Sequence, residues 1–265
     1  MIYYFSGTGN SLYVARHLAD LLGEQLFPMT LAGSGSLPHG GGLEGAAIGL
    51  VFPVYGWGIP NVVEEFVRRH KASFESAYLY AVMTCGDDMG YTDWVLEKAL
   101  GRKLDAAFSV LMPDVYVCLP GFDVDSKEEC REKFEKEKET VQLIAECVKN
   151  RQVVRHLKRG PFPWAKTYIL RPLFNRYLVT DKYFRVDASS CVSCGRCQKM
   201  CPVGNIIMGT PLKGERGGGL EVPQWQSHCA GCLACYHACP HHAINFGKMT
   251  QKKGQYNLLK MKNEE

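Results

Sequence analysis

Apolar residues follow two periods along the first 150 residues of the chain. Short apolar runs predict five β-strands, over residues 2–6, 25–29, 46–52, 77–83 and 106–112. Between these runs the apolar positions recur every three or four residues. This predicts helices after residue 10, after Pro60, over 92–100 and over about 126–150. Strands that alternate with helices indicate an α/β domain with a doubly wound parallel sheet, here over residues 1–150.

Two cysteine runs of identical spacing lie in the last third of the chain. Residues 191–202 read Cys-x2-Cys-x2-Cys-x3-Cys-Pro, and residues 229–240 repeat that spacing. Such runs bind iron–sulfur clusters, and in two-cluster arrangements the fourth cysteine of each run ligates the cluster of the other run. The sequence therefore predicts two [4Fe-4S] clusters within residues 187–247. The expected ligands are Cys191, Cys194, Cys197 and Cys239 for the first cluster, and Cys229, Cys232, Cys235 and Cys201 for the second.

Zinc is the alternative metal, because cysteines in Cys-x2-Cys pairs also bind zinc. A zinc site takes four ligands, so the third cysteine of each run and the trailing Cys-Pro would have no role in it. The spacing favours iron–sulfur clusters, and electron transfer is the chemistry that they indicate.

The cysteine module contains an internal repeat. Residues 201–206 mirror residues 239–244, which predicts a pseudo-two-fold arrangement, with Asn205 where the second repeat has Ala243. A glycine run at 217–219 predicts a hairpin-like loop between the two cysteine runs, and a Gly/Ser-rich loop is predicted over 33–45. Next to Cys239, we expect His237, His241 and His242 to be surface residues. The polar residues 248–265 are expected to be loosely held.

Composition fits an ordinary globular protein of two modest domains. The chain has 265 residues, of which 46% are hydrophobic and 22% charged. Neither a signal peptide nor an apolar stretch long enough to cross a bilayer is evident. Thiolate-ligated clusters need a reducing compartment, so we expect a cytoplasmic protein. Oligomeric state cannot be read from the sequence.

The formal net charge of +4 is concentrated in residues 151–186 and just before them. Between Lys149 and Arg185 the chain has ten Lys or Arg residues and one acid, Asp181. This basic and aromatic segment is expected to connect the two domains. An acidic redox partner protein or peripheral contact with an anionic membrane is the alternative role for it. No recognition motif accompanies the charge, so nucleic acid is not expected as a partner.

A glycine-bearing turn directly follows the first predicted strand. It places backbone N–H groups and three hydroxyls at the start of a helix, an arrangement that binds anions. The turn lacks the Gly-Lys-Ser/Thr of nucleotide triphosphate loops and the Gly-x-Gly-x-x-Gly of dinucleotide sites, so a phosphate monoester such as that of FMN suits it best. The alternative is a simple strand–helix turn. The candidate residues are Ser6, Gly7, Thr8, Gly9, Asn10 and Ser11.

Two later loops leave the carboxyl ends of the third and fourth strands, where open α/β sheets bind ligands. Their glycines allow close backbone approach and their aromatic residues could flank a flavin ring, although packing is the alternative role. We expect Asp87 and Asp88 to be solvated or capping residues, and we assign no catalytic residue. The cofactor-binding candidates are Pro53, Val54, Tyr55, Gly56, Trp57, Thr84, Cys85, Gly86, Asp87 and Tyr91.

Three segments resemble those of a known family. The turn at 6–11 resembles the phosphate loop of flavodoxins, and the cysteine runs resemble those of bacterial 2[4Fe-4S] ferredoxins. The segments 5–11, 52–60 and 112–116 together are similar to the flavodoxin–ferredoxin fusion proteins of anaerobes, the EFR-type ferredoxin family. This resemblance implies a five-stranded flavodoxin-like sheet of order 2-1-3-4-5 with bound FMN, followed by a small α+β ferredoxin domain.

Two classes of function remain open from the sequence. The first is an electron carrier that relays electrons between FMN, the clusters and redox partner proteins. The second is an oxidoreductase that reduces a small molecule at FMN, with the clusters supplying the electrons. A third class is a flavodoxin-like domain without FMN that only mediates docking. An enclosed cavity with a polar anchor would favour the oxidoreductase, and an open site would favour the carrier.

Overall fold

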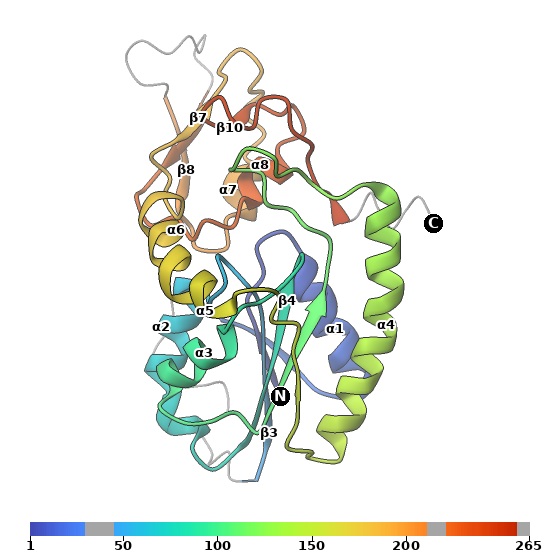
Figure 1. Cartoon of the computed structure of the whole chain (residues 1–265). Helices are drawn as coiled ribbons and strands as arrows, with labels where there is room; N and C mark the ends of the chain where they lie inside the picture. The colour runs from blue at the N-terminus through green and yellow to red at the C-terminus, as the bar shows by residue number, and fades with distance from the viewer. Residues whose placement is uncertain (30–44, 211–220, 259–265) are drawn as a thin grey trace.

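The computed structural model describes residues 1–29, 45–210 and 221–258 of the chain. Its larger part is a parallel sheet of six strands in the order β2-β1-β3-β4-β5-β6, and its smaller part is the cysteine module, which sits above the sheet in Figure 1. The predicted loop over 33–45 and the glycine run at 217–219 lie outside the described residues, apart from Gly45. No helix in the described part of the chain is long and apolar enough to cross a membrane.

The sheet confirms the predicted parallel α/β domain but corrects its strand count from five to six. The strands are β1 (Ile2–Tyr4), β2 (Leu26–Pro28), β3 (Ala47–Pro53), β4 (Tyr78–Cys85), β5 (Ala106–Leu111) and β6 (Arg155–His156). The order of the first five is the expected 2-1-3-4-5, which is consistent with a flavodoxin-like fold. The sixth strand pairs parallel with β5 through Ala107 and Phe108. It comes from the segment predicted to be a connector.

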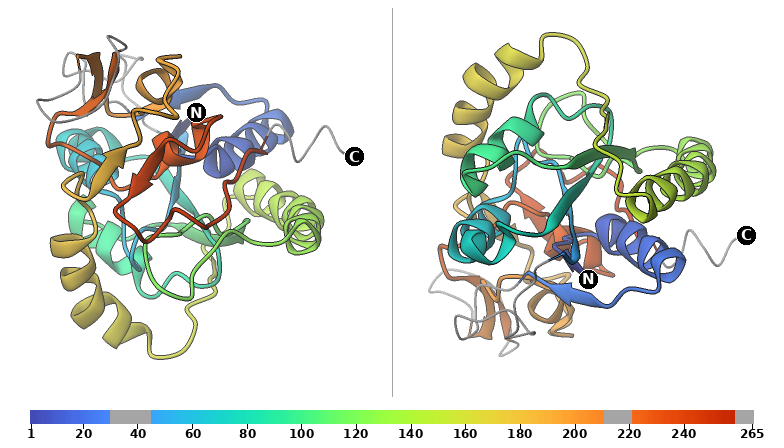
Figure 2. Two further views of the ribbon diagram at one scale, coloured as in Figure 1. Left: turned by 90° about the horizontal axis from the view of Figure 1, so that it is seen from above. Right: turned by 90° about the horizontal axis from the view of Figure 1, so that it is seen from below.

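Two layers of helices cover the sheet. On one face lie α1 (Asn10–Leu22) and α4 (Lys127–Lys149), and on the other lie α2 (Asn61–His70), the 3-10 turn η1 (Lys71–Phe74) and α3 (Thr92–Leu100) (Figures 1 and 2). Each face has its own apolar core, because β3 and β4 are buried on both sides. The α4 helix begins at a capping box, in which the Ser126 hydroxyl and the Glu129 carboxylate each accept the other residue's backbone N–H.

The cysteine module consists of two short antiparallel ribbons and two short helices. The ribbons are β7 (Phe184–Val186) with β10 (Ile244–Phe246), and β8 (Ile206–Gly209) with β9 (Val222–Trp225). The helices α7 (Arg196–Met200) and α8 (Ala234–Ala238) occupy equivalent positions in the two cysteine runs. The backbone N–H groups of Asn205 and Ala243 also make equivalent bonds, each 3.2 Å long, to the sulfurs of Cys201 and Cys239. These features fit the predicted pseudo-two-fold relation.

Asn205 adds contacts that Ala243 cannot make. Its side chain donates to Asp181 at 3.0 Å and accepts the backbone N–H groups of Gln226 and His228. Asp181 also accepts the N–H of Ser227, so a buried amide and a carboxylate together shape the turn before Cys229.

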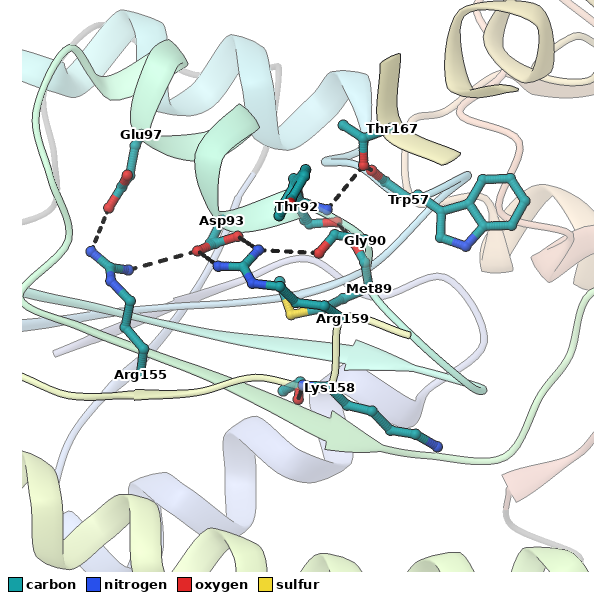
Figure 3. Close-up of polar contacts among 12 residues, drawn as sticks. Trp57, Met89, Gly90, Thr92, Asp93, Glu97, Arg155, Lys158, Arg159 and Thr167 are labelled. Carbon is teal, nitrogen blue, oxygen red and sulfur yellow. Dashed lines mark hydrogen bonds and ion pairs between the residues drawn. The ribbon is translucent and has the colours of Figure 1, made fainter. Parts of the chain in front are cut away.

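Ion pairs of basic residues attach residues 155–167 to α3 and to the loop after β4 (Figure 3). The guanidinium of Arg159 donates two hydrogen bonds of 2.8 Å to the fully buried carboxylate of Asp93, and Arg155 pairs with Glu97 at 2.7 Å. Lys166 pairs with the buried Asp88 at 2.5 Å. With Lys158, which faces Asp87, four of the ten basic residues between 149 and 185 are engaged with acids of the sheet domain. Part of the unusual charge of this segment therefore serves attachment to the sheet domain.

A helical run follows the attachment and leads to the cysteine module. It consists of α5 (Pro163–Ala165), the π-helical turn η2 (Lys166–Leu170) and α6 (Arg171–Tyr177), and it lies along one edge of the molecule (Figure 2). The Thr167 hydroxyl accepts the N–H of Tyr91 at 2.9 Å and donates to the carbonyl of Trp57 at 3.2 Å. One side chain thus joins the run to two loops of the sheet domain.

The C-terminal segment 248–258 is packed, which corrects the expectation of a loosely held segment for these residues; residues 259–265 lie outside the described part of the chain. Thr250 and Tyr256 are buried. The Tyr256 hydroxyl donates to Asn10 at 2.7 Å, and its backbone N–H donates to His237 at 3.0 Å. These polar side chains can be buried because hydrogen bonds satisfy them, those of Thr250 within the cysteine module and that of Tyr256 to the sheet domain.

We expect Arg159→Gln to destabilise the protein strongly, because it leaves the buried Asp93 carboxylate with Arg155 at 3.9 Å as its nearest cation. Breaking a buried ion pair typically costs about 3 kcal/mol of unfolding free energy. Arg68→Gln is the matched control, since its pair with Glu64 is exposed and worth under about 1 kcal/mol. Denaturant titration of the cluster-loaded protein measures both, and equal losses would contradict the attachment role of Arg159.

Candidate functional site

A cavity of about 670 Å³ opens at the carboxyl ends of the strands of the sheet. Its walls include the predicted loops after β1, β3 and β4, and also the loop after β5, the α6 helix and a turn of the cysteine module. Most predicted cofactor-binding residues therefore converge on one space. Two do not line it: Gly9 and Tyr91.

The turn after β1 meets the cavity at the start of α1. Gly9 caps this helix in a left-handed conformation with φ of 107°, no side chain caps it, and its first turn contains no acid. The hydroxyl of Ser6 is buried in the cavity wall and has no hydrogen-bond partner. A helix terminus without a side-chain cap and an unpaired hydroxyl together form a site that suits an anion.

Two polar side chains of this turn are already engaged by neighbouring loops. Ser11 shares a hydrogen bond of 2.7 Å with the hydroxyl of Thr84, and Asn10 donates to the carbonyl of Pro113 at 2.9 Å. They hold the loops after β1, β4 and β5 together. Ser6 and Thr8 are the residues whose hydroxyls remain for a ligand, since both line the cavity and neither hydroxyl has a partner among the described residues.

The loop after β3 runs directly beneath α6. A Cβ added to Gly56, whose φ is 52°, would lie 2.5 Å from the ring of Phe174, so only glycine fits there. Trp57 also has a positive φ, and the Lys166 ammonium lies 5.6 Å from the centre of its ring. This loop can therefore contact a ligand on one side only, because α6 covers the other.

The loop after β4 differs from expectation at two residues. Asp88 is not solvated; it is buried beside Lys166, whereas Asp87 is exposed as expected. Tyr91 turns away from the cavity and stacks on Trp94, with ring centres 4.0 Å apart. Burial raises the pKa of Cys85 to about 12, so this thiol stays protonated and unreactive at neutral pH.

Several cavity residues were missed in the sequence. They come from the loop after β5 and from α6, and include Asp114, Tyr116, Leu119, Phe122, Leu173 and Tyr177. Burial raises the pKa of Asp114 above its ordinary value, and the buried hydroxyl of Tyr116 has no hydrogen-bond partner. The available signal was the segment 112–116, which follows a strand end on the same sheet edge as the other loops.

The eight cysteines of the two runs gather into two groups of four. Cys191, Cys194, Cys197 and Cys239 line one small cavity. Burial raises the pKa of Cys197 to about 11, and its three neighbours Cys239, Cys191 and Cys194 add to the shift. In the second group, burial raises the pKa of Cys235 well above its ordinary value, and Cys232, Cys229 and Cys201 add to it. The structure thus brings together the two sets expected from cross-ligation.

His237 is buried, contrary to the expectation of a surface residue. Its ring contacts the carbonyl of Val115 at 2.8 Å and accepts the N–H of Tyr256. Burial lowers its pKa to about 4, which keeps the ring neutral at physiological pH. His241 is exposed and His242 is half-buried.

Comparison with known proteins concerns mainly the cysteine module. Residues 190–244 match the family described as "4Fe-4S dicluster domain". The curated protein "Uncharacterized ferredoxin MJ0722" of Methanocaldococcus jannaschii is 33% identical over 75 residues, which make up 28% of this chain and 91% of that protein. The chain belongs to the ferredoxin family. It is an iron–sulfur electron-transfer protein with a [4Fe-4S] binding domain.

The sheet domain of this ferredoxin extends beyond that relative. The chain also aligns with the solved structure of rubredoxin oxygen:oxidoreductase from the anaerobe Desulfovibrio gigas, with 20% identity and a TM-score of 0.37. The alignment covers 57% of the ferredoxin and 36% of that chain. Among the described residues, no three His, Cys, Asp or Glu side chains form a site for a single metal ion.

In this ferredoxin, we expect Cys201→Ser to damage the cluster that the second run holds. Anaerobic alkylation followed by mass spectrometry should then show Cys229, Cys232 and Cys235 freed for labelling. Cys239→Ser is the reciprocal control, and should free Cys191, Cys194 and Cys197 instead. Labelling of the cysteines in the mutated residue's own run, in both variants, would contradict cross-ligation.

Proposed function

We propose that this ferredoxin relays electrons between an FMN in the cavity and two [4Fe-4S] clusters held by the two cysteine groups. A flavin exchanges two electrons, singly or as a pair, whereas each cluster carries one. Such a protein converts between one-electron and two-electron chemistry. Thiolate ligation needs a reducing environment, so the proposal includes the cytoplasm as its location.

The residues of the cavity fit FMN. The turn at 6–11 offers uncapped backbone N–H groups and the unpaired Ser6 hydroxyl to a phosphate monoester, and it carries no lysine that a nucleotide triphosphate would need. Tyr55, Trp57 and the glycines of two loops supply flat, apolar surfaces for a ring system. The half-buried Asp114, whose pKa is raised by desolvation, is available to hold a proton near that ring.

The observation that carries the proposal is the shared wall between the cavity and the cysteine module. Cys232 lines the cavity together with Gly231 and Leu233, which precede and follow it. An expected cluster ligand thus borders the space assigned to the flavin, with no other element between them. This arrangement supports electron exchange within one chain.

We expect Ser6→Ala to weaken FMN binding about tenfold and to leave the iron content unchanged. One hydrogen bond to a charged phosphate is worth about 1.5 kcal/mol, and the alanine variant would lack it. Ser73→Ala is the control, because Ser73 is exposed and distant in sequence from the cavity loops. Flavin affinity is measured by fluorescence titration of the apoprotein, and unchanged affinity in Ser6→Ala would contradict the phosphate assignment.

Reduction of a small molecule at the flavin is a second candidate function. It is favoured by the partial cover that α6 and the cysteine module give the cavity, and by the unpartnered hydroxyl of Tyr116 in its wall. A covered site with a polar anchor is what an enzyme would need and a pure carrier would not.

The two functions differ in their response to Tyr116→Phe. For an oxidoreductase with a carbonyl acceptor such as menadione, loss of this hydroxyl should raise KM several-fold and leave cluster potentials unchanged. Menadione reduction without saturation, or with an unchanged KM, would leave the carrier as the better description. Absence of flavin bands from anaerobically purified protein would refute both and favour a docking module.

A further inference from the structure

The two cysteine groups have unlike surroundings, although their spacing is the same. Of the eight cysteines, only Cys194 is exposed. Beside it, the side chains of Val192 and Met200 are 52% and 47% exposed. We call the group of Cys191, Cys194, Cys197 and Cys239 the outer group, and the other four cysteines the inner group.

The inner group abuts the sheet domain. A Cβ added to Gly7 would lie 2.6 Å from the Cβ of Cys232 and 2.8 Å from the hydroxyl of Tyr55. The neighbouring Gly231 meets Val179 of the connecting segment, where an added Cβ would be 3.3 Å from the valine side chain. Loops of the sheet domain and the connector thus cover the inner group, whereas no described residues cover Cys194 in this way.

The surface around the outer group has an apolar centre flanked by two unpaired cations and two acids. Arg196 and Lys199 lie on α7, are exposed, and form no ion pair with any described residue. The nearby Asp187 carboxylate accepts hydrogen bonds from Ser189 and Ser190, which partly satisfies its charge. Glu221 is exposed, and its backbone carbonyl accepts the Ser193 hydroxyl, so one acid borders the surface.

We propose that the outer group is the port at which a small acidic redox protein docks, and that the inner group exchanges electrons with the flavin cavity. This inference rests on the proposed relay. Exposed apolar residues beside the two unpaired cations of α7 suit transient recognition of an anionic protein surface. At each encounter one electron is lost by the partner and gained at the outer group, or the reverse, and no bond or proton is transferred there.

This port differs from the basic connector that the sequence suggested for an acidic partner. In the connector, Arg155, Lys158, Arg159 and Lys166 are already paired with acids of the same chain. Their charge is neutralised locally, whereas that of Arg196 and Lys199 is not. Arg176, which is exposed on α6, remains available to test the connector as the rival docking surface.

The docking surface is tested by stopped-flow electron transfer from a chemically reduced plant-type [2Fe-2S] ferredoxin, used as an acidic one-electron probe. We expect the double variant Arg196→Gln/Lys199→Gln to lower the second-order rate constant several-fold at low ionic strength, and the difference to vanish in high salt. Lys98→Gln, which removes an exposed charge from α3, should leave the rate unchanged. A rate lowered by Arg176→Gln but not by the double variant would overturn the port and favour the connector.

Flavin fluorescence in anaerobically loaded protein tests whether the inner group, and not the outer group, lies next to the flavin. A nearby cluster quenches a flavin, so Cys229→Ser, which disrupts the inner group, should raise bound-flavin fluorescence several-fold. Cys194→Ser, which disrupts the outer group, should change it little. Equal or reversed effects would overturn the order. Protein without flavin would instead refute the proposed function, and the docking result would still stand because it follows cluster absorbance.

Discussion

Buried carboxylates on one side of the sheet domain are the constraint on which the rest of the structure depends. Asp88, Asp93 and Glu97 are all buried, and an isolated buried carboxylate is too costly to persist in its charged form. Asp88 and Asp93 take their cations from residues 155–166, outside the five-stranded unit, and Glu97 pairs with Arg155 from that segment as well as with Lys103. The sheet domain therefore requires the connecting segment to neutralise its buried acids. These ion pairs in turn hold the backbone of residues 155–166 against the sheet domain.

That path determines the shape of the cavity. From Lys166 the chain continues as a helical run over the loop after β3, where the absence of a side chain at Gly56 lets Phe174 approach. The same run ends beside the cysteine module and fixes where its inner turn lies. Thr250 and Tyr256 close the opposite side through hydrogen bonds to both domains. A site that would be an open edge in a bare sheet domain thereby becomes a partly covered cavity with Cys232 in its wall.

Local periodicity explains which parts of this fold the sequence could predict. The five main strands and their helices follow from apolar spacing, because strands buried on both faces need continuous apolar runs. The sixth strand has two residues, Arg155 and His156, and carries no such signal. Tyr91 was misassigned because the composition of a loop does not reveal which way a side chain points. The packing of Tyr256 and the burial of His237 depend on hydrogen bonds between residues distant in sequence, which no local pattern records.

The asymmetry between the cysteine groups, however, can be related to the residues that lie between the cysteines of each run. The first run has Gly195 and Arg196 between its second and third cysteines, whereas the second run has Leu233 and Ala234 at the same positions. Leu233 and Ala234 are both buried, and burial of the leucine contributes about 2 kcal/mol, while a guanidinium at position 234 would have to lose its hydration without a partner. The same substitution pattern therefore turns one arm of a near-symmetric module toward the sheet domain and leaves the other facing water. Two positions thus make the two halves of the repeat unlike, one facing the sheet domain and one facing solvent. The proposed relay needs such a difference, because its two ends exchange electrons with different partners.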